Sequence, residues 1–199
     1  MSTANLLAMV TRLRQATSCP QVLTTENIRS AKVDRCVDLV EQILTDPEEK
    51  VVVFCAFKDS ANAVCQALSE YKPLLCTGDV DESTINRSID VFQNSDDYRV
   101  LVATMAKMGT GVTLNRAHYA IFVEQAWTDG VQLQCEDRIH RIGTNQKVFI
   151  YRLVTLDTID ERVIELLQDK KALSDYVVDD DIPVENIASL QKYIQELTY

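Results

Sequence analysis

A continuous apolar run at residues 51–57, VVVFCAF, limits the possible fold more than any other feature of the chain. It is rich in β-branched residues and shows no alternation between apolar and polar positions, which is typical of a strand covered on both faces. Such strands occur in parallel sheets that have helices packed on both sides. The run therefore predicts a central strand of an α/β sheet.

Strand and helix patterns alternate along the rest of the chain. The expected strands cover residues 74–76, 99–103, 119–123 and 148–154, and the expected helices cover residues 4–16, 31–46, 59–70, 83–93 and 130–141. Ser30 is placed to cap the second helix. This alternation predicts a doubly wound parallel sheet, and in such sheets ligands bind beyond the carboxyl ends of the strands.

Composition narrows the function classes. The chain has 199 residues, enough for one main domain, and a net charge of −10. Residues 157–199 carry 11 acidic and 4 basic residues, so the overall charge argues against coating nucleic acid but leaves a local basic site open. Six cysteines without a CxxC pair, with only two histidines, argue against a zinc framework and predict buried free thiols.

No apolar run reaches the roughly 18 residues that a membrane helix needs, and the N-terminus has no signal-peptide pattern. We therefore expect an intracellular protein, cytoplasmic or nuclear, that has no contact with membranes.

The densest group of candidate functional residues is QCEDRIHRIG at 134–143. Helical spacing would put Gln134, Arg138 and Arg141 on one face, where two guanidinium groups suit the oxygens of a phosphate chain. This is the arrangement of an arginine finger. The alternative is a solvated helix whose arginines pair with Glu136 and Asp137.

A second candidate is TMAKMGTGVTL, the segment that follows the expected strand at 99–103. The backbone at Gly109 and Gly111 would allow close approach of a phosphate, with the hydroxyls of Thr104 and Thr110 as donors and Lys107 as a cation. The alternative is a simple tight turn. It is not a Walker A loop, because that motif occurs nowhere in the chain.

The single tryptophan, Trp127, follows the expected strand at 119–123. It could stack on a nucleic-acid base, but a loop tryptophan seated on the core is the simpler interpretation.

Taken in order, these segments resemble the C-terminal RecA-like domain of Swi/Snf-type DNA-dependent ATPases, in helicase superfamily two. The resemblance covers about residues 6–173. The segments that carry it are RLRQATSCP (12–20), Ser30-Ala31-Lys32, VVVFCAF as motif IV, 104–114 as motif V, WTDGVQLQCEDRIHRIG (127–143) as the tryptophan block with motif VI, and VFIYRLVTLDTIDERV (148–163). The chain departs from the family pattern at several positions: Lys107-Met108 replaces Ala-Gly and Thr113 replaces the usual Asn in motif V, and Asp129 replaces the proline after the tryptophan. Ile85 stands where an arginine is common, with Arg87 two residues later.

The resemblance implies specific roles. ATP with Mg²⁺ would lie between two RecA-like lobes, and this lobe would supply Arg138 and Arg141 as arginine fingers, supported by Gln134. Gly109 and Gly111 would also lie at the nucleotide. Motifs IV and V would contact the double-stranded DNA backbone through Lys58, Thr104, Lys107 and Thr110.

The resemblance also implies an incomplete motor, because the Walker A and Walker B residues of the family belong to an N-terminal lobe. We expect residues 1–30 to be a helical segment leading into the lobe, 31–173 the RecA-like helicase C-terminal domain, and 174–199 an acidic connector with a helix open to a protein partner. Such a chain would form part of an ATP hydrolase and would be inactive alone. The alternatives are a non-catalytic nucleic-acid- or protein-binding module with the same fold, and an RNA helicase lobe.

Overall fold

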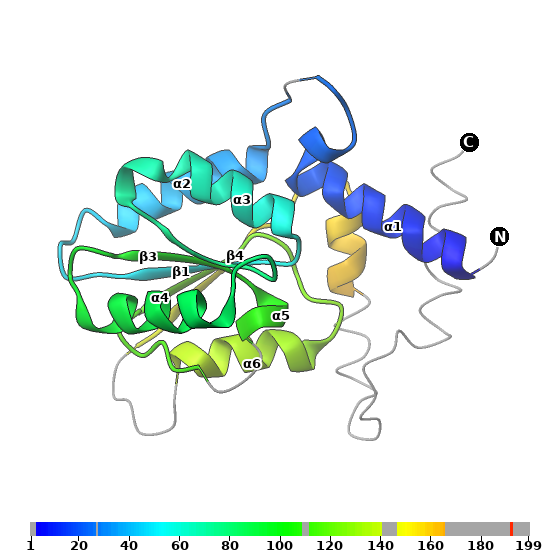
Figure 1. Cartoon of the computed structure of the whole chain (residues 1–199). Coiled ribbons are helices and arrows are strands. Elements are labelled where there is room, and N and C mark those ends of the chain that lie inside the picture. Colours follow the sequence, from blue (N-terminus) through cyan, green and yellow to red (C-terminus); the bar gives the residue numbers. More distant parts are fainter. Residues whose placement is uncertain (1–2, 27, 109–111, 141–146, 166–191, 193–199) are drawn as a thin grey trace.

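The computed structural model describes residues 3–26, 28–108, 112–140, 147–165 and 192 (Figure 1). Its strands are β1 (Val51–Cys55), β2 (Leu74–Cys76), β3 (Val100–Thr104), β4 (Tyr119–Phe122) and β5 (Phe149–Arg152). Its helices are α1 (Thr3–Ser18), α2 (Ala31–Ile43), α3 (Lys58–Ala67), α4 (Glu82–Asn94), α5 (Met105–Met108) and α6 (Asp129–Ile139), with short 3-10 helices at Pro20–Val22 and Ser69–Tyr71. Residues 159–165 are also helical.

The five strands form one parallel sheet in the order β2-β3-β1-β4-β5. The apolar run seen in the sequence is the central strand: Val53 lies opposite Val102 on one side and opposite Ile121 on the other. All five residues of β1 are buried, because helices cover both faces of the sheet at this point. The predicted doubly wound α/β fold is confirmed.

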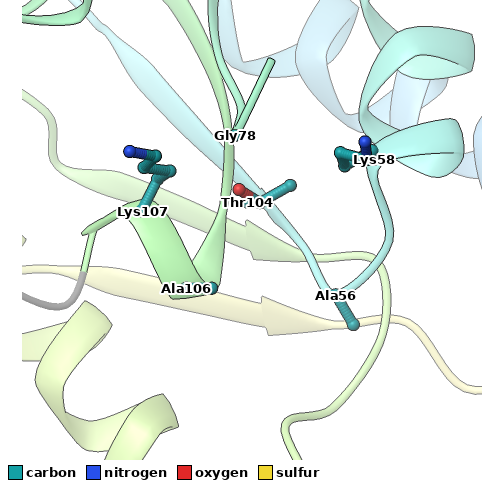
Figure 2. Close-up of a pocket in the computed structure, with 6 residues that line it drawn as sticks. All are labelled: Ala56, Lys58, Gly78, Thr104, Ala106 and Lys107. Carbon is teal, nitrogen blue, oxygen red and sulfur yellow. The ribbon is translucent and has the colours of Figure 1, made fainter. Parts of the chain in front are cut away.

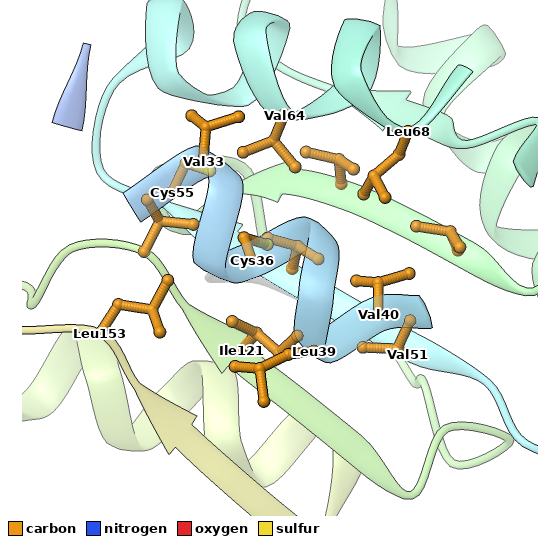
Figure 3. Packing of buried hydrophobic residues seen from close by; sticks show 14 of the residues in the cluster. Val33, Cys36, Leu39, Val40, Val51, Cys55, Val64, Leu68, Ile121 and Leu153 are labelled. Carbon is orange, nitrogen blue, oxygen red and sulfur yellow. The ribbon is translucent and has the colours of Figure 1, made fainter. Parts of the chain in front are cut away.

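Two helical layers enclose the sheet. Figure 1 shows α2 and α3 on one face, and α4, α5 and α6 on the other. On the first face, apolar side chains of α2 and α3 pack together with those of the strands (Figure 3). The members of this cluster labelled in the figure are Val33, Cys36, Leu39, Val40, Val51, Cys55, Val64, Leu68, Ile121 and Leu153. Helices therefore cover both faces of the sheet, and a site can form at the carboxyl ends of its strands.

Two helices end earlier than the sequence predicted, and one short helix was not predicted. Ser30 caps α2 as expected, with its hydroxyl oxygen accepting a hydrogen bond from the amide of Val33 at 3.3 Å. However, α2 ends at Ile43, and α6 ends at Ile139, where the next residue, His140, takes an extended backbone. The short helix α5 was not predicted, because four residues carry no helical periodicity.

The six cysteines are free thiols, and all but the half-buried Cys65 are buried, as the sequence predicted. Burial raises the pKa of Cys36 and of Cys135 to about 12. These thiols therefore act as small apolar side chains of the core.

The first and last described helical segments pack together beside the sheet. Leu6 and Val10 of α1 form a small apolar cluster with Ile159 and Val163 (Figure 1). Next to this cluster, the ammonium of Lys32 lies 2.6 Å from the carboxylate of Asp160, and both side chains are buried. The ion pair ties the N-terminus of α2 to the segment that follows β5.

Candidate functional site

A pocket of about 320 Å³ lies at the carboxyl ends of β1, β2 and β3. Ala56, Lys58, Gly78, Thr104, Ala106 and Lys107 line it (Figure 2). Three different strands deliver these residues, because parallel strands end at the same edge of the sheet. Figure 2 shows Lys58 and Lys107 on opposite sides, with Thr104 between them. Three of the four residues predicted to contact DNA therefore line one pocket.

Local structure explains why these side chains meet. Thr104 is the last residue of β3 and is buried, so its position is fixed by the sheet. Lys107 lies in α5, which begins directly after β3, and it is exposed. Lys58 is the first residue of α3, two residues after Ala56. The two lysines carry their charge on flexible side chains and can reach the oxygens of a phosphate, while Thr104 is held in place by the strand.

Lys58 already has an anionic partner within this chain. Its ammonium contacts both carboxylate oxygens of Asp79 at 2.8 Å, and both side chains are exposed. The hydrogen bond with Asp79, together with its charge, raises the pKa of Lys58 above its usual value. Asp79 directly follows Gly78 of the pocket and pairs with Lys58, so a carboxylate lies beside the pocket.

Helix α6 carries two of the predicted nucleotide residues. Gln134 is exposed, and Arg138, one turn later, is half-buried. The Nε of Arg138 donates a hydrogen bond to the carbonyl of Met108 at 3.3 Å, and its own carbonyl accepts one from the amide of Leu114 at 2.7 Å. The helix is therefore tied to the residues on either side of the predicted motif V glycines.

The structure shows the predicted helical spacing for Gln134 and Arg138, which both lie in α6. The helix ends at Ile139, so the place of Arg141 beside these two residues stays a prediction. Arg141, Gly109, Thr110 and Gly111 lie outside the described residues, as does all of the segment 174–199 except residue 192.

The acidic neighbour Glu136 has a partner on another element. It accepts a hydrogen bond from the guanidinium of Arg152 in β5 at 2.6 Å. The hydrogen bond of Arg138 with Met108 lies on the side of α5, next to the pocket.

Sequence reasoning missed a second group of residues at the carboxyl edge. The guanidinium of Arg14 in α1 stacks over the ring of Trp127 at 4.4 Å and donates a hydrogen bond to the carbonyl of Gln125. The buried carboxylate of Glu124 accepts a hydrogen bond from the amide of Ala56 at 2.8 Å. Trp127 packs on the apolar cluster of α1, as its core-seated interpretation predicted. Arg14 and Trp127 are far apart in the sequence, and no local pattern pairs them.

Two other kinds of site have no support in the part of the chain that the structure describes. There, no three His, Cys, Asp or Glu side chains gather in a way that could hold a metal ion. In the same residues, no helix is both long enough and apolar enough to cross a lipid bilayer.

Comparison with known proteins shows what the chain is similar to. The family described as "Helicase conserved C-terminal domain" matches residues 31–143. The ATP-dependent helicase FUN30 of Saccharomyces cerevisiae is 30% identical over 162 residues, which cover 80% of this chain. The same alignment covers only 14% of FUN30, so the chain spans a small part of that relative.

Solved structures give the same result. The C-terminal part of the Fun30 ATPase domain superposes with a TM-score of 0.69 at 26% identity, covering 84% of this chain and 55% of that one. The Sulfolobus solfataricus SWI2/SNF2 ATPase core in complex with dsDNA superposes with a TM-score of 0.70 at 24% identity, covering 86% of this chain and 37% of that one. This second likeness concerns the fold.

Proposed function

The chain belongs to the helicase conserved C-terminal domain family, of the Swi2/Snf2 type, and on that premise we propose that it is the C-terminal motor lobe of an ATP-dependent double-stranded DNA translocase or helicase-like protein. In this role it contacts the DNA backbone and supplies arginines to ATP held by an N-terminal lobe. The observation that carries the proposal is the pocket at the carboxyl edge, which gathers Lys58, Thr104 and Lys107.

The pocket supports contact with phosphate rather than with bases. Its cations are two lysines on opposite sides, and its fixed donor is a hydroxyl group at the end of β3. Ammonium and hydroxyl groups bind phosphate oxygens without reading the sequence of the nucleic acid. The relative solved with dsDNA makes duplex DNA the substrate to test first.

The contact between α6 and α5 supports a link between DNA and nucleotide. Arg138 donates to the carbonyl of Met108, and Met108 ends the helix that presents Lys107 to the pocket. A shift of α5 on DNA binding would therefore move the helix that carries the proposed finger. Arginines at a transferring phosphoryl group stabilise the charge that develops in the transition state.

ATP and Mg²⁺ fit this lobe only in part. Arg138 and Gln134 offer donors for phosphate oxygens, whereas the described residues offer no group of carboxylates for Mg²⁺. The metal ion and most of the nucleotide would be held by the N-terminal lobe, which would be the obligatory partner. Arg141, Gly109 and Gly111 stay candidates for the same nucleotide site.

The decisive experiment is ATP hydrolysis with duplex DNA by this chain joined to an N-terminal Swi2/Snf2 lobe, in trans or by fusion. We expect activity only with both lobes, and a loss of about 10³-fold or more in kcat for Arg138→Ala and for Arg141→Ala. Arg35→Ala, an exposed arginine of α2, is the matched control and should retain activity. Folded lobes that stay inactive together would favour the non-catalytic binding module instead.

DNA binding by the chain is tested separately, by measuring affinity at several salt concentrations. Lys107→Ala should weaken binding to duplexes of any sequence and reduce the salt slope by about 1. Gly78→Leu should weaken binding by filling the pocket, because a side chain there would meet no protein atom within 4 Å at its Cβ. Unchanged affinity in both variants would place the DNA contact elsewhere.

A further inference from the structure

Arg14 is a buried cation that the proposed motor function does not yet use. The residue is 2% exposed, and its guanidinium lies over two aromatic rings, 4.4 Å from the centre of Trp127 and 5.5 Å from that of Phe57. Burial lowers the pKa of Arg14, while the nearby carboxylates of Glu124 and Asp160 raise it. An arginine remains charged in such a site, because its intrinsic pKa is far above neutral.

The group that Arg14 holds is the connector, residues 123–128, which joins β4 to α6. Its start is fixed to β1, because the amide of Val123 donates to the carbonyl of Phe54 at 3.0 Å and the carboxylate of Glu124 accepts from the amide of Ala56 at 2.8 Å. Arg14 holds the connector further along, through the carbonyl of Gln125 and the ring of Trp127. Ala56 lines the pocket, so the connector contacts a pocket residue through Glu124 before it reaches α6.

The beginning of α6 depends on this connector. Thr128 occupies the N-cap position of α6, but its side chain makes no capping hydrogen bond. Without a side-chain cap, the first residues of a helix are not held in place by a local hydrogen bond, and contacts with the rest of the chain position them. The far end of the same helix carries Arg138, one turn after Gln134. The orientation of these two side chains therefore depends on how the connector positions α6.

We propose that Arg14 is a positioning residue for α6: by holding the connector at Gln125 and Trp127, it sets the helix that presents the proposed nucleotide residues. Arg14 touches neither DNA nor nucleotide and acts through the connector. The effect on hydrolysis rests on the proposed function, whereas the effect on α6 does not. In this proposal, α1 contributes to function through Arg14 and does not only pack against the rest of the lobe.

The first test uses the chain alone, with Arg14→Met, Arg14→Lys and the control Arg12→Met, which changes an exposed arginine on the same helix. Trp127 is the only tryptophan, so the emission spectrum reports directly on the connector. For Arg14→Met we expect a changed emission and amide hydrogen exchange in α6 that is about tenfold faster, with exchange in β1 and β3 unchanged. Arg12→Met should match the wild type. Equal acceleration in α6, β1 and β3 would reduce Arg14 to general stability and overturn the proposal.

The second test measures ATP hydrolysis with the N-terminal lobe and duplex DNA. Arg14→Met should lower kcat by about 10- to 100-fold, because a small displacement of a catalytic group is costly, and should leave the KM for ATP within about twofold. Arg14→Lys keeps a cation at the rings but not the planar stack, so it should recover part of kcat. Unchanged kcat with altered exchange in α6 would overturn the catalytic part of the proposal.

The two proposals fail in different ways. A wild-type chain that is inactive with every N-terminal lobe would overturn the proposed function and the predicted loss of kcat together. The exchange of α6 relative to β1 and β3 would still decide, in the chain alone, whether Arg14 positions the helix.

Discussion

Lys32 and Asp160 form a buried ion pair, 2.6 Å between ammonium and carboxylate, that joins the N-terminus of α2 to the segment after β5. Asp160 also accepts hydrogen bonds from the amide of Thr155 at 3.0 Å and from the hydroxyl of Thr17 at 3.2 Å. One carboxylate therefore holds three segments of the chain: α1, the start of α2 and the residues that follow β5.

Removing one partner of this pair should destabilise the fold strongly, because the other charge stays buried and unpaired. We expect Lys32→Met to lower the free energy of unfolding by about 3–5 kcal/mol, as measured by urea denaturation. The double variant Lys32→Met with Asp160→Leu should recover much of this loss. The exposed pair Arg29–Asp34 is the control, and Arg29→Met should cost less than about 1 kcal/mol. Strictly additive losses at Lys32 and Asp160 would contradict the coupling.

Asp79 should restrain DNA binding, since its carboxylate occupies Lys58 beside the pocket. Asp79→Asn should tighten binding of duplex DNA several-fold at low salt, and the gain should fade as salt is raised. The measurement is a fluorescence-anisotropy titration at several salt concentrations. Asp38→Asn, an exposed carboxylate on α2, changes the net charge equally and is the control. An equal gain in both variants would show that only bulk charge matters.

Asp81 should make the stability of the fold depend on acid pH. It caps α4, and hydrogen bonds from Ser83 and Thr84 hold its pKa well below the usual range. A carboxylate with a lowered pKa in the folded state contributes stability above its unfolded pKa and loses that contribution as pH falls through the folded value. The difference in urea midpoint between the wild type and Asp81→Ala should therefore be constant from neutral pH to about pH 5 and shrink below about pH 4. A difference that stays constant to about pH 3 would contradict this role of the charge.

Cys65 should be the most reactive thiol among the six. It is half-buried, and burial raises its pKa as well, but burial raises the pKa of the buried Cys36 and Cys135 to about 12 and that of Cys76 to about 11. Because the thiolate is the reactive form, alkylation of the native chain at about pH 8 should modify Cys65 first and the others only on unfolding. Mass spectrometry of the digested protein measures this order. Cys65→Ser should remove the fast phase, and a fast phase that persists would show that another thiol is accessible.

The sequence predicted the sheet well, because each strand carries a local pattern. The apolar run of β1 and the shorter runs of the other strands needed no tertiary information. The ends of α2 and α6 were less predictable: both helices end two to three residues before the predicted bounds, at Ile43 and Ile139. Periodicity identifies a helix but does not fix its last turn.

Site residues that belong to a recognisable local pattern were predictable, whereas contacts between residues from distant segments were not. Lys58 and Lys107 follow strands and Thr104 ends one, and the rule for parallel sheets brings such residues to one edge. The ion pair of Lys58 with Asp79 and the stack of Arg14 on Trp127 join residues that lie far apart in the sequence. Single side chains of this kind have no repeating pattern, so only the folded structure reveals their partners.

The strand order has a consequence for folding during synthesis. β1 pairs with β3 and β4 but not with β2, the strand that directly follows it in the sequence. While the ribosome makes the chain, the wholly apolar segment 51–55 therefore has no strand partner until residues 100–104 emerge. Pairing between strands far apart in the sequence is slow, and it leaves intermediates with exposed apolar surface. The nascent chain is therefore most prone to aggregate between the synthesis of residues 51–55 and that of residues 100–104.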